Sequence, residues 1–417
     1  MANSVDMICR LSIGKDTEKY HPYINRVSDS GWETKILKLS AKAGDSMHTL
    51  SLKGFHNTNA SDKDEFTIFT KSQYDSEGNV IKEGERETVN YEDRNDPDIL
   101  KRASNMSKFV IDLATPEQRK VRNAIARKVR NNETLTDEDF KFLGVDNEDD
   151  AKKAFKALKN LHHEYLHCGD YIDFIKEMID GGQYANKKFH IVHCPVVYQY
   201  NLKHADGQPL FYESFEPNSI YLADDDAIEY AEQSFEFLFN GESLDTSSKK
   251  DGQLFLDGWV INRYDSTLKQ TSVPVPLRVV YHVPTNEDLR EKQIAYLEKK
   301  FKARRDEIKM IKLTCDVING SPRAEVTYEM LSEEQKERHD LWGVSLEELA
   351  REMGGYVRGP RVHEIRFKTP DGEPEATEYH NDDMQVKIPD SEENPFEKAE
   401  TKSKATESEE DDDDWLS

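Results

Sequence analysis

The sequence lacks the features of a membrane-spanning or exported protein. It contains no apolar run of 18 residues, and no apolar stretch near the N-terminus resembles the core of a signal peptide. Its four cysteines, Cys9, Cys168, Cys194 and Cys315, are far apart and form no C-x-x-C pair. This spacing is unlike a disulfide framework or a zinc knuckle, and we expect reduced thiols in an intracellular, cytoplasmic protein.

Sequence motifs of nucleotide and acyl chemistry are also absent. There is no Walker A loop, no G-x-G-x-x-G and no G-x-S-x-G. One enzyme motif is present, because His163-Glu164-Tyr165-Leu166-His167 matches H-E-x-x-H. That chemistry needs two histidines one helical turn apart to hold zinc, with the glutamate activating water. We expect the motif near the end of a helix over 149–168, on its wet side, and therefore predict no metal, no cofactor and no catalytic residue. A zinc hydrolase is the alternative.

Acidic charge is concentrated at the C-terminus. The formal net charge is −25, and residues 370–417 carry 18 acidic residues against four lysines. Such a segment buries too little apolar surface to fold, so we predict a disordered tail over 370–417. The chain ends with an acidic run and an apolar tip that we expect to bind partners: Asp411, Asp412, Asp413, Asp414, Trp415 and Leu416. The charge can compete with nucleic acid for basic surface, and the tip can fill an apolar pocket.

The pattern along the chain predicts alternating β and helical regions. Residues 1–100 read as β, with a hairpin around Ala43-Gly44-Asp45. Residues 101–186 read as helical, with a strong helix start at Thr115-Pro116-Glu117-Gln118. Residues 187–284 return to β, interrupted by a helix expected near 225–239. The sequence is compatible with two separate β modules and with one sheet shared by both β regions.

The sequence pattern over residues 285–369 predicts a module of helices and strands. It starts with a basic helix, followed by a hairpin around Asn319-Gly320 that joins strands over 309–318 and 324–328. Two short helices begin at Ser332 and Ser345, and a last strand covers 356–367. No internal repeat is visible. We predict the α+β class, built from small OB-like β barrels with helical insertions and the disordered acidic tail.

Basic residues gather locally in this acidic chain. Residues 101–130 hold nine basic and two acidic residues, and the arginines of the helix are expected on the side away from Val121 and Val129. A solvated helix balanced by acidic neighbours is the alternative. Aromatic residues next to cations in 187–284 suggest base stacking beside phosphate contacts. The predicted DNA-binding residues are Lys101, Arg102, Lys108, Arg119, Arg122, Arg127, Arg130, Lys187, Lys188, Tyr198, Tyr200, Trp259, Arg358 and Arg361.

The arrangement resembles the replicative single-stranded DNA-binding proteins of large tailed phages. The segments that carry the resemblance are Gly31-Trp32-Glu33-Thr34-Lys35, Ala43-Gly44-Asp45, Met330-Leu331-Ser332-Glu333-Glu334-Gln335 and Gly354-Gly355-Tyr356-Val357-Arg358-Gly359, together with the acidic tail. Bacterial single-stranded DNA-binding proteins usually end in acidic residues followed by Pro-Phe. Here Asn394-Pro395-Phe396 lies inside the tail, and the chain ends in Trp415-Leu416-Ser417.

The resemblance implies a non-enzymatic protein of phage DNA replication, recombination and repair, in the host cell cytoplasm. Its partners would be single-stranded DNA and, through the tail, replication proteins such as a polymerase, helicase or primase. Besides the zinc hydrolase, a third possibility is an acidic scaffold or virion protein that binds no DNA.

Overall fold

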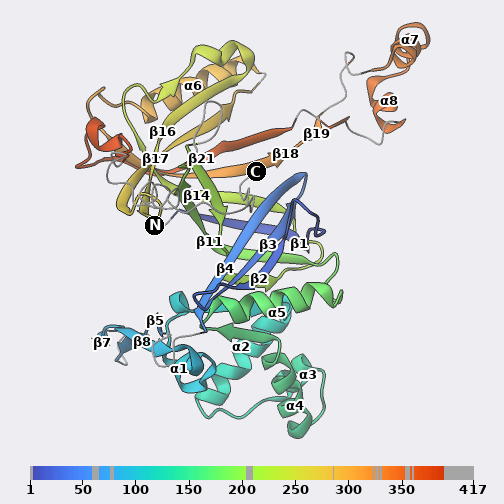
Figure 1. Cartoon of the computed structure of the whole chain (residues 1–417). Coiled ribbons are helices and arrows are strands. Elements are labelled where there is room, and N and C mark those ends of the chain that lie inside the picture. The colour runs from blue at the N-terminus through green and yellow to red at the C-terminus, as the bar shows by residue number, and fades with distance from the viewer. Residues whose placement is uncertain are drawn as a thin grey trace, which may run out of the picture.

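The computed structural model describes residues 3–58, 65–75, 79–202, 210–284, 286–321, 323–324, 328, 331–352, 357–358 and 361–388. It is a mixed α+β fold dominated by β structure, with 15 strands joined in one sheet (Figure 1). The α+β class predicted from the sequence is therefore confirmed, and the two predicted β regions share this sheet. Within the described chain, no helix combines the length and apolarity needed to cross a membrane.

The elements follow one another in three groups. The first group comprises β1 (Ser4–Ile13), β2 (Tyr23–Val27), β3 (Trp32–Ala43), β4 (Ser46–Asn57), β5 (Glu65–Phe69), β6 (Gln73–Tyr74), β7 (Val80–Lys82), β8 (Arg86–Asn90), α1 (Pro97–Arg102) and β9 (Phe109–Asp112). The second comprises α2 (Pro116–Arg130), α3 (Asp137–Leu143), α4 (Glu148–Lys159), β10 (His162–Tyr165), α5 (Cys168–Asp180), β11 (Lys188–Tyr200), β12 (Phe211–Phe215), β13 (Ser219–Leu222) and β14 (Tyr230–Phe239). The third comprises β15 (Leu244–Asp245), β16 (Gln253–Asp265), β17 (Gln270–His282), α6 (Glu287–Lys300), β18 (Lys309–Gly320), β19 (Arg323–Ala324), α7 (Glu333–Trp342), α8 (Leu346–Glu352), β20 (Val357–Arg358), β21 (Val362–Ala376) and the 3-10 helix η5 (Asn381–Met384).

Five strands of the sheet form a first circuit, in which the pairings return to the starting strand. β1 pairs with β3, β3 with β4, β12 with β11, and β11 with β1, all antiparallel. The link between β4 and β12 is parallel, through Leu50 and Phe215. Helix α5 lies between β4 and β11 in the sequence and packs on β4, where a Cβ on Gly54 would come within 2.7 Å of the Gly169 nitrogen. Glycine at position 54 therefore permits this close approach.

A second circuit repeats the same order with β14, β16, β17, β21 and β18. β14 pairs with β16, β16 with β17, β21 with β18, and β18 with β14, all antiparallel. Again one link is parallel, between β17 and β21 through Val279 and Ile365. Again one helix, α6, precedes the fourth strand in sequence. The structure thus contains a repeat of strand order that the sequence does not display.

The two circuits are joined edge to edge by β1 and β14. These strands pair antiparallel from Ser4 with Ser234 to Ile8 with Tyr230. One apolar core runs through both circuits and includes Met7, Leu39 and Phe189 of the first and Phe237 of the second. The pairing and the shared core make the two circuits one continuous structure.

Two long connections interrupt the strand order of the two circuits. Residues 58–167 lie between β4 and α5 and carry the paired strands β5–β8 and β6–β7, helices α1–α4, and β9 paired with β10. Residues 321–361 lie between β18 and β21 and carry α7 and α8, which Figure 1 shows apart from the sheet at the upper right. Helix α2 begins with the predicted capping box, in which the Gln118 amide donates to Thr115 Oγ1 over 3.2 Å and Gln118 Oε1 accepts from the Thr115 amide over 2.9 Å.

Four predicted elements are wrong in detail. The helix expected near 225–239 is strand β14, because Ala231, Phe235 and Phe237 are buried at alternating positions. The helix expected over 149–168 ends at Lys159, and strand β10 follows. Most of β18 pairs with β21 rather than with a strand over 324–328. Finally, β21 continues to Ala376 and η5 follows it, so the fold extends well beyond residue 369.

Candidate nucleic-acid interface

The outer side of β2, β3 and β4 forms a continuous surface on the first circuit. On β3 and β4 the buried positions alternate with exposed ones, and Leu37, Leu39, Leu50 and Leu52 point into the core. Residues opposite each other in an antiparallel pair share a side of the sheet. The register therefore places one set of side chains together, which we call the β2–β4 face: Ile24, Arg26, Trp32, Thr34, Ile36, Lys38, Ser40, Lys42, Met47, Thr49, Ser51, Lys53 and Phe55.

Large apolar side chains are exposed on the β2–β4 face. Trp32 is 47% exposed, Phe55 is 54% exposed and Met47 is 44% exposed. Trp32 and Phe55 lie near one end of the face, because Thr34 is opposite Phe55 in the register. Met47 lies at the other end, opposite Lys42 and next to the hairpin turn, where Gly44 has a φ of +60°. Exposed aromatic rings on a sheet are suited to stacking against flat ligands.

The charge of these three strands is positive in an otherwise acidic chain. Their five cations are Arg26, Lys35, Lys38, Lys42 and Lys53, and their one carboxylate is that of Glu33. Glu33 lies on the other side of β3 from the face. It is 3.9 Å from Lys35 Nζ, which also bonds Asp173 over 2.5 Å. The β2–β4 face therefore carries cations and no carboxylate of its own strands.

The lysines of the face are available for a ligand. Lys42 and Lys53 are exposed, and Lys38 lies over the ring of Tyr20, 5.6 Å from its centroid. Within the described ranges, none of these three lysines forms an ion pair. Aromatic rings beside uncompensated cations can stack bases while neutralising a phosphate backbone.

The corresponding face of the second circuit, on β16 and β17, is covered by the chain itself. Met384 of η5 is 5% exposed and packs in one cluster with Leu238, Trp259 and Ile261. Gln270 Nε2 donates to the Lys387 carbonyl over 2.8 Å, which fixes the same segment. On this face Arg278 is compensated, since it donates to Asp257 over 2.6 and 2.8 Å, whereas Arg263 of β16 is exposed.

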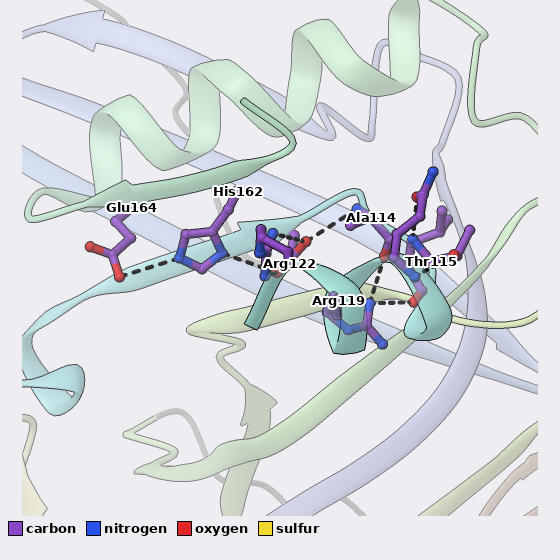
Figure 2. A network of polar contacts seen from close by, with 9 residues as sticks. Ala114, Thr115, Arg119, Arg122, His162 and Glu164 are labelled. Carbon is purple, nitrogen blue, oxygen red and sulfur yellow. Dashed lines mark hydrogen bonds and ion pairs between the residues drawn. The ribbon is translucent and has the colours of Figure 1, made fainter. Parts of the chain in front are cut away.

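Two of the cations predicted to bind DNA are buried in a polar network, and Figure 2 shows the part of this network around Arg122 and His162. Arg122 is 8% exposed and donates to both oxygens of Asp112, over 3.1 and 2.5 Å. His162 lies between two carboxylates, with Nδ1 3.1 Å from Asp112 and Nε2 3.3 Å from Glu164. Lys108 is 3% exposed and donates to Glu164 over 2.6 Å.

The pKa shifts in this network follow from the alternation of charges. Hydrogen bonds to Asp112 and Glu164 raise the pKa of His162 to about 9. Burial opposes ionisation of Asp112, but hydrogen bonds from His162 and Arg122 lower its pKa to about 2. Hydrogen bonding to His162 and to Lys108 lowers the pKa of Glu164 to about 2. Both nitrogens of His162 face carboxylates, so it serves as a fixed cation that joins β10 to β9 and not as a proton-transfer group.

The other predicted cations have mixed surroundings. Arg119 donates to the carbonyls of Ala114 and Leu222 over 2.7 and 2.8 Å. Arg102 pairs with Glu87, Lys187 with Asp225, and Lys188 donates to the Ala227 carbonyl. The predicted cations that are exposed, with no ion pair in the described parts of the chain, are Lys101, Arg127, Arg130 and Arg361.

The predicted stacking residues lie in the core or under the C-terminal segment. Tyr198 is 5% exposed and Tyr200 is 8% exposed, so both point inward. Trp259 is half-buried beneath Met384. The backbone of Arg358 pairs with that of Arg323 between β20 and β19. The six predicted partner-binding residues of the tail lie outside the described residues.

The H-E-x-x-H motif does not lie on a helix. His163 and Glu164 are on β10, and His167 caps the start of α5. His167 Nε2 donates to the Phe55 carbonyl over 3.0 Å while Nδ1 accepts from the Gly169 amide over 3.0 Å, and the ring of His163 lies 4.3 Å from that of Phe174. No cluster of three metal-ligating side chains occurs among the residues that are described. The expected helical placement of the motif is wrong.

The densest basic run of the sequence, residues 101–130, does not contain the residues of the β2–β4 face. The available signal was the near absence of acid in three strands of an acidic chain, with Lys38, Lys42 and Lys53 at alternating, outward positions. Comparison of the chain with protein-family models, curated proteins and solved structures finds no match.

Proposed function

We propose that this chain is a sequence-tolerant single-stranded DNA-binding protein that binds through the β2–β4 face. The observation that carries the proposal is the combination of exposed Trp32 and Phe55 with Lys38, Lys42 and Lys53 on a side of β3 and β4 where these strands place no carboxylate. Stacking on bases and neutralisation of phosphates are the two interactions that hold single strands without reading sequence.

We further propose that each circuit is an OB-like barrel. The support is the shared strand order, with one parallel link and one helix before the fourth strand. OB folds bind oligonucleotides and oligosaccharides on the face of their second and third strands. In the first circuit those strands are β3 and β4, which carry most of the face. The four cations of the face, Arg26, Lys38, Lys42 and Lys53, favour a polyanion over a neutral oligosaccharide.

A single strand fits this face better than a duplex. Bases in a duplex are already stacked on each other, so their flat sides are hidden from Trp32 and Phe55. The rings of these residues project from a sheet and not from a helix that enters a groove. From the resemblance stated above, the proposal also includes a phage replication setting and recruitment of replication proteins by Trp415 and Leu416, both of which stay predictions.

The test is fluorescence anisotropy of labelled oligo-dT and of a matching duplex across a salt series. We expect tighter binding of the single strand, with affinity that falls as salt rises. Replacing Lys38, Lys42 and Lys53 together by glutamine is expected to make the log–log salt slope shallower by about 2, at roughly 0.7 per lost phosphate contact. A matched control replaces three exposed lysines of α4, Lys152, Lys153 and Lys156, by glutamine.

Equal effects of the two triple variants would mean that general charge, and not the β2–β4 face, governs binding. Equal affinity for duplex and single strand, or no binding at low salt, would refute the proposed function.

A further inference from the structure

A cavity of about 360 Å³ lies at the hairpin end of the β2–β4 face. Its lining combines Arg10, Lys42 and Met47 with Tyr184 and Asn186 from the segment that follows α5. Arg10 is opposite Lys42, and Lys42 is opposite Met47, so these three side chains continue the row of outward residues. A strand that follows the face past Lys38 therefore reaches this cavity.

The walls of the cavity are apolar and aromatic. Met47 is exposed, while Tyr184 is half-buried with its ring 6.4 Å from that of Phe189. Leu11 and Ile179 also line the cavity and pack against the main core. The volume lies within the range of roughly 300–1,000 Å³ that small-ligand sites occupy, and it is far larger than a phosphate ion requires.

The polar groups at the rim can hold an anion and a base edge. Lys42 is exposed and forms no ion pair in the described ranges. Arg10 Nη2 pairs with Glu229 over 2.9 Å, while Arg10 Nε is buried and has no hydrogen-bond partner among the described residues. The Gly44 amide also donates to Glu229 over 2.9 Å, so that carboxylate is held by two donors.

Asn186 contributes an amide with both donor and acceptor groups. Its backbone has a φ of 64°, a left-handed conformation that asparagine adopts more readily than most residues. This places an amide side chain in a short loop beside the aromatic wall, where it can bond the edge of a base.

We infer that this cavity binds one nucleotide of the bound strand, with its base between Tyr184 and Met47 and its phosphate at Lys42. The inference rests on the proposed function and adds a single nucleotide-binding subsite to it. The ligand class is a nucleoside monophosphate unit, because the walls suit a base and the rim suits a phosphate. Asn186 is the group that contacts the edge of the base, and Lys42 is the group that contacts the phosphate oxygens.

The experiment uses the full chain with ¹³C-labelled methionine methyl groups, titrated with thymidine monophosphate and, separately, with inorganic phosphate. We expect thymidine monophosphate to shift the Met47 methyl resonance, with no change at Met106, which is 80% exposed on the 58–167 insertion. Inorganic phosphate alone is expected to give a much smaller shift. Tyr184→Leu is expected to weaken thymidine monophosphate binding at least fivefold.

A second variant tests the same cavity if Tyr184→Leu disturbs folding. Asn186→Gly removes the amide while glycine tolerates the positive φ, and it is expected to weaken binding about threefold to tenfold through loss of one base contact. Tyr264→Leu, an exposed tyrosine of the second circuit, is the control and should leave binding unchanged.

An equal Met47 shift with inorganic phosphate would overturn the inference in favour of a plain anion site. An unmoved Met47 methyl in a protein that still binds oligo-dT would also overturn it, while leaving the proposed function intact. Failure of oligo-dT binding itself would instead remove the function on which the inference rests.

Discussion

The two circuits have the same strand order but present opposite surfaces at the same position. On the first, β3 and β4 expose Trp32, Phe55 and lysines that form no ion pair in the described parts of the chain. On the second, β16 and β17 lie under Met384, and Arg278 is compensated by Asp257. Strand order thus supplies two equivalent places for a site, and the side chains leave one of them open.

The joint between the circuits also differs from an ordinary apolar interface. Tyr198 Oη lies 3.2 Å from Asn3 Nδ2 and 3.3 Å from both Glu213 Oε1 and Gln233 Nε2. Gln233 belongs to β14 and is fully buried, while Tyr198 and Glu213 belong to β11 and β12. A polar cluster therefore holds the second circuit in register with the first.

The largest expected effect comes from removing both aromatic residues of the open face. Trp32→Ala with Phe55→Ala is expected to lower oligo-dT affinity about 100-fold, since each stacked base contributes roughly 1–3 kcal/mol. Both rings are exposed, so the melting temperature should change little. Anisotropy and thermal unfolding measure the two quantities. A large loss of stability with unchanged affinity would mean that Trp32 and Phe55 stabilise the fold and do not bind DNA.

The joint is expected to respond to pH through Glu213. Burial raises the pKa of Glu213 to about 7, above the usual carboxyl range. Because the folded protein binds this proton more tightly than the unfolded chain, protonation of Glu213 contributes its full stability below about pH 4.5. That contribution is lost as the pH rises to about 7. Glu213→Gln should therefore raise the free energy of unfolding by about 2–3 kcal/mol at pH 8 and have little effect at pH 4. Chemical denaturation at both pH values measures this, and an equal effect at each would contradict the assignment.

The covered face is expected to matter for stability and not for DNA. Met384→Ala removes a buried side chain from the cluster with Leu238 and Ile308 and should cost about 2 kcal/mol of unfolding free energy. Oligo-dT affinity should stay within twofold of wild type. Tighter DNA binding by this variant would show that the second face becomes a site once it is uncovered.

The polar network of the insertion gives the smallest expected effect. Because the pKa of His162 is raised to about 9, its contribution is full below about pH 6.5 and is lost as pH rises through 9. His162→Gln should lower the free energy of unfolding by about 1 kcal/mol at pH 6 and by almost nothing at pH 10. Unchanged stability at pH 6 would mean that the contacts to Asp112 and Glu164 contribute nothing.

Local patterns in the sequence predicted much of the fold. The hairpin around Gly44 and the capping boxes at Thr115 and Ser332 are present, because turn and cap chemistry is fixed by neighbouring residues. The strand order was not predictable, since the parallel links of Leu50 with Phe215 and Val279 with Ile365 join distant segments. Long-range pairing leaves no local pattern.

The site was less predictable than the fold. A count of basic residues selects Arg122 and Lys108, yet the fold brings Asp112 and Glu164 beside them and buries the pairs. The sequence does not determine which side of its strand Tyr198 occupies, and the structure places the ring in the core. Assigning a cation to a ligand requires knowing its partners in space, and alternation on β3 and β4 was the one local clue to the open face.

The central claim is that the β2–β4 face binds single-stranded DNA, and that the basic stretch over 101–130 and the second circuit do not. Hydrogen–deuterium exchange of the full chain with and without oligo-dT tests it most directly. Binding at the β2–β4 face predicts new protection of backbone amides over 23–57, and none over 253–282. Protection confined to 101–130, with residues 23–57 unchanged, would contradict it.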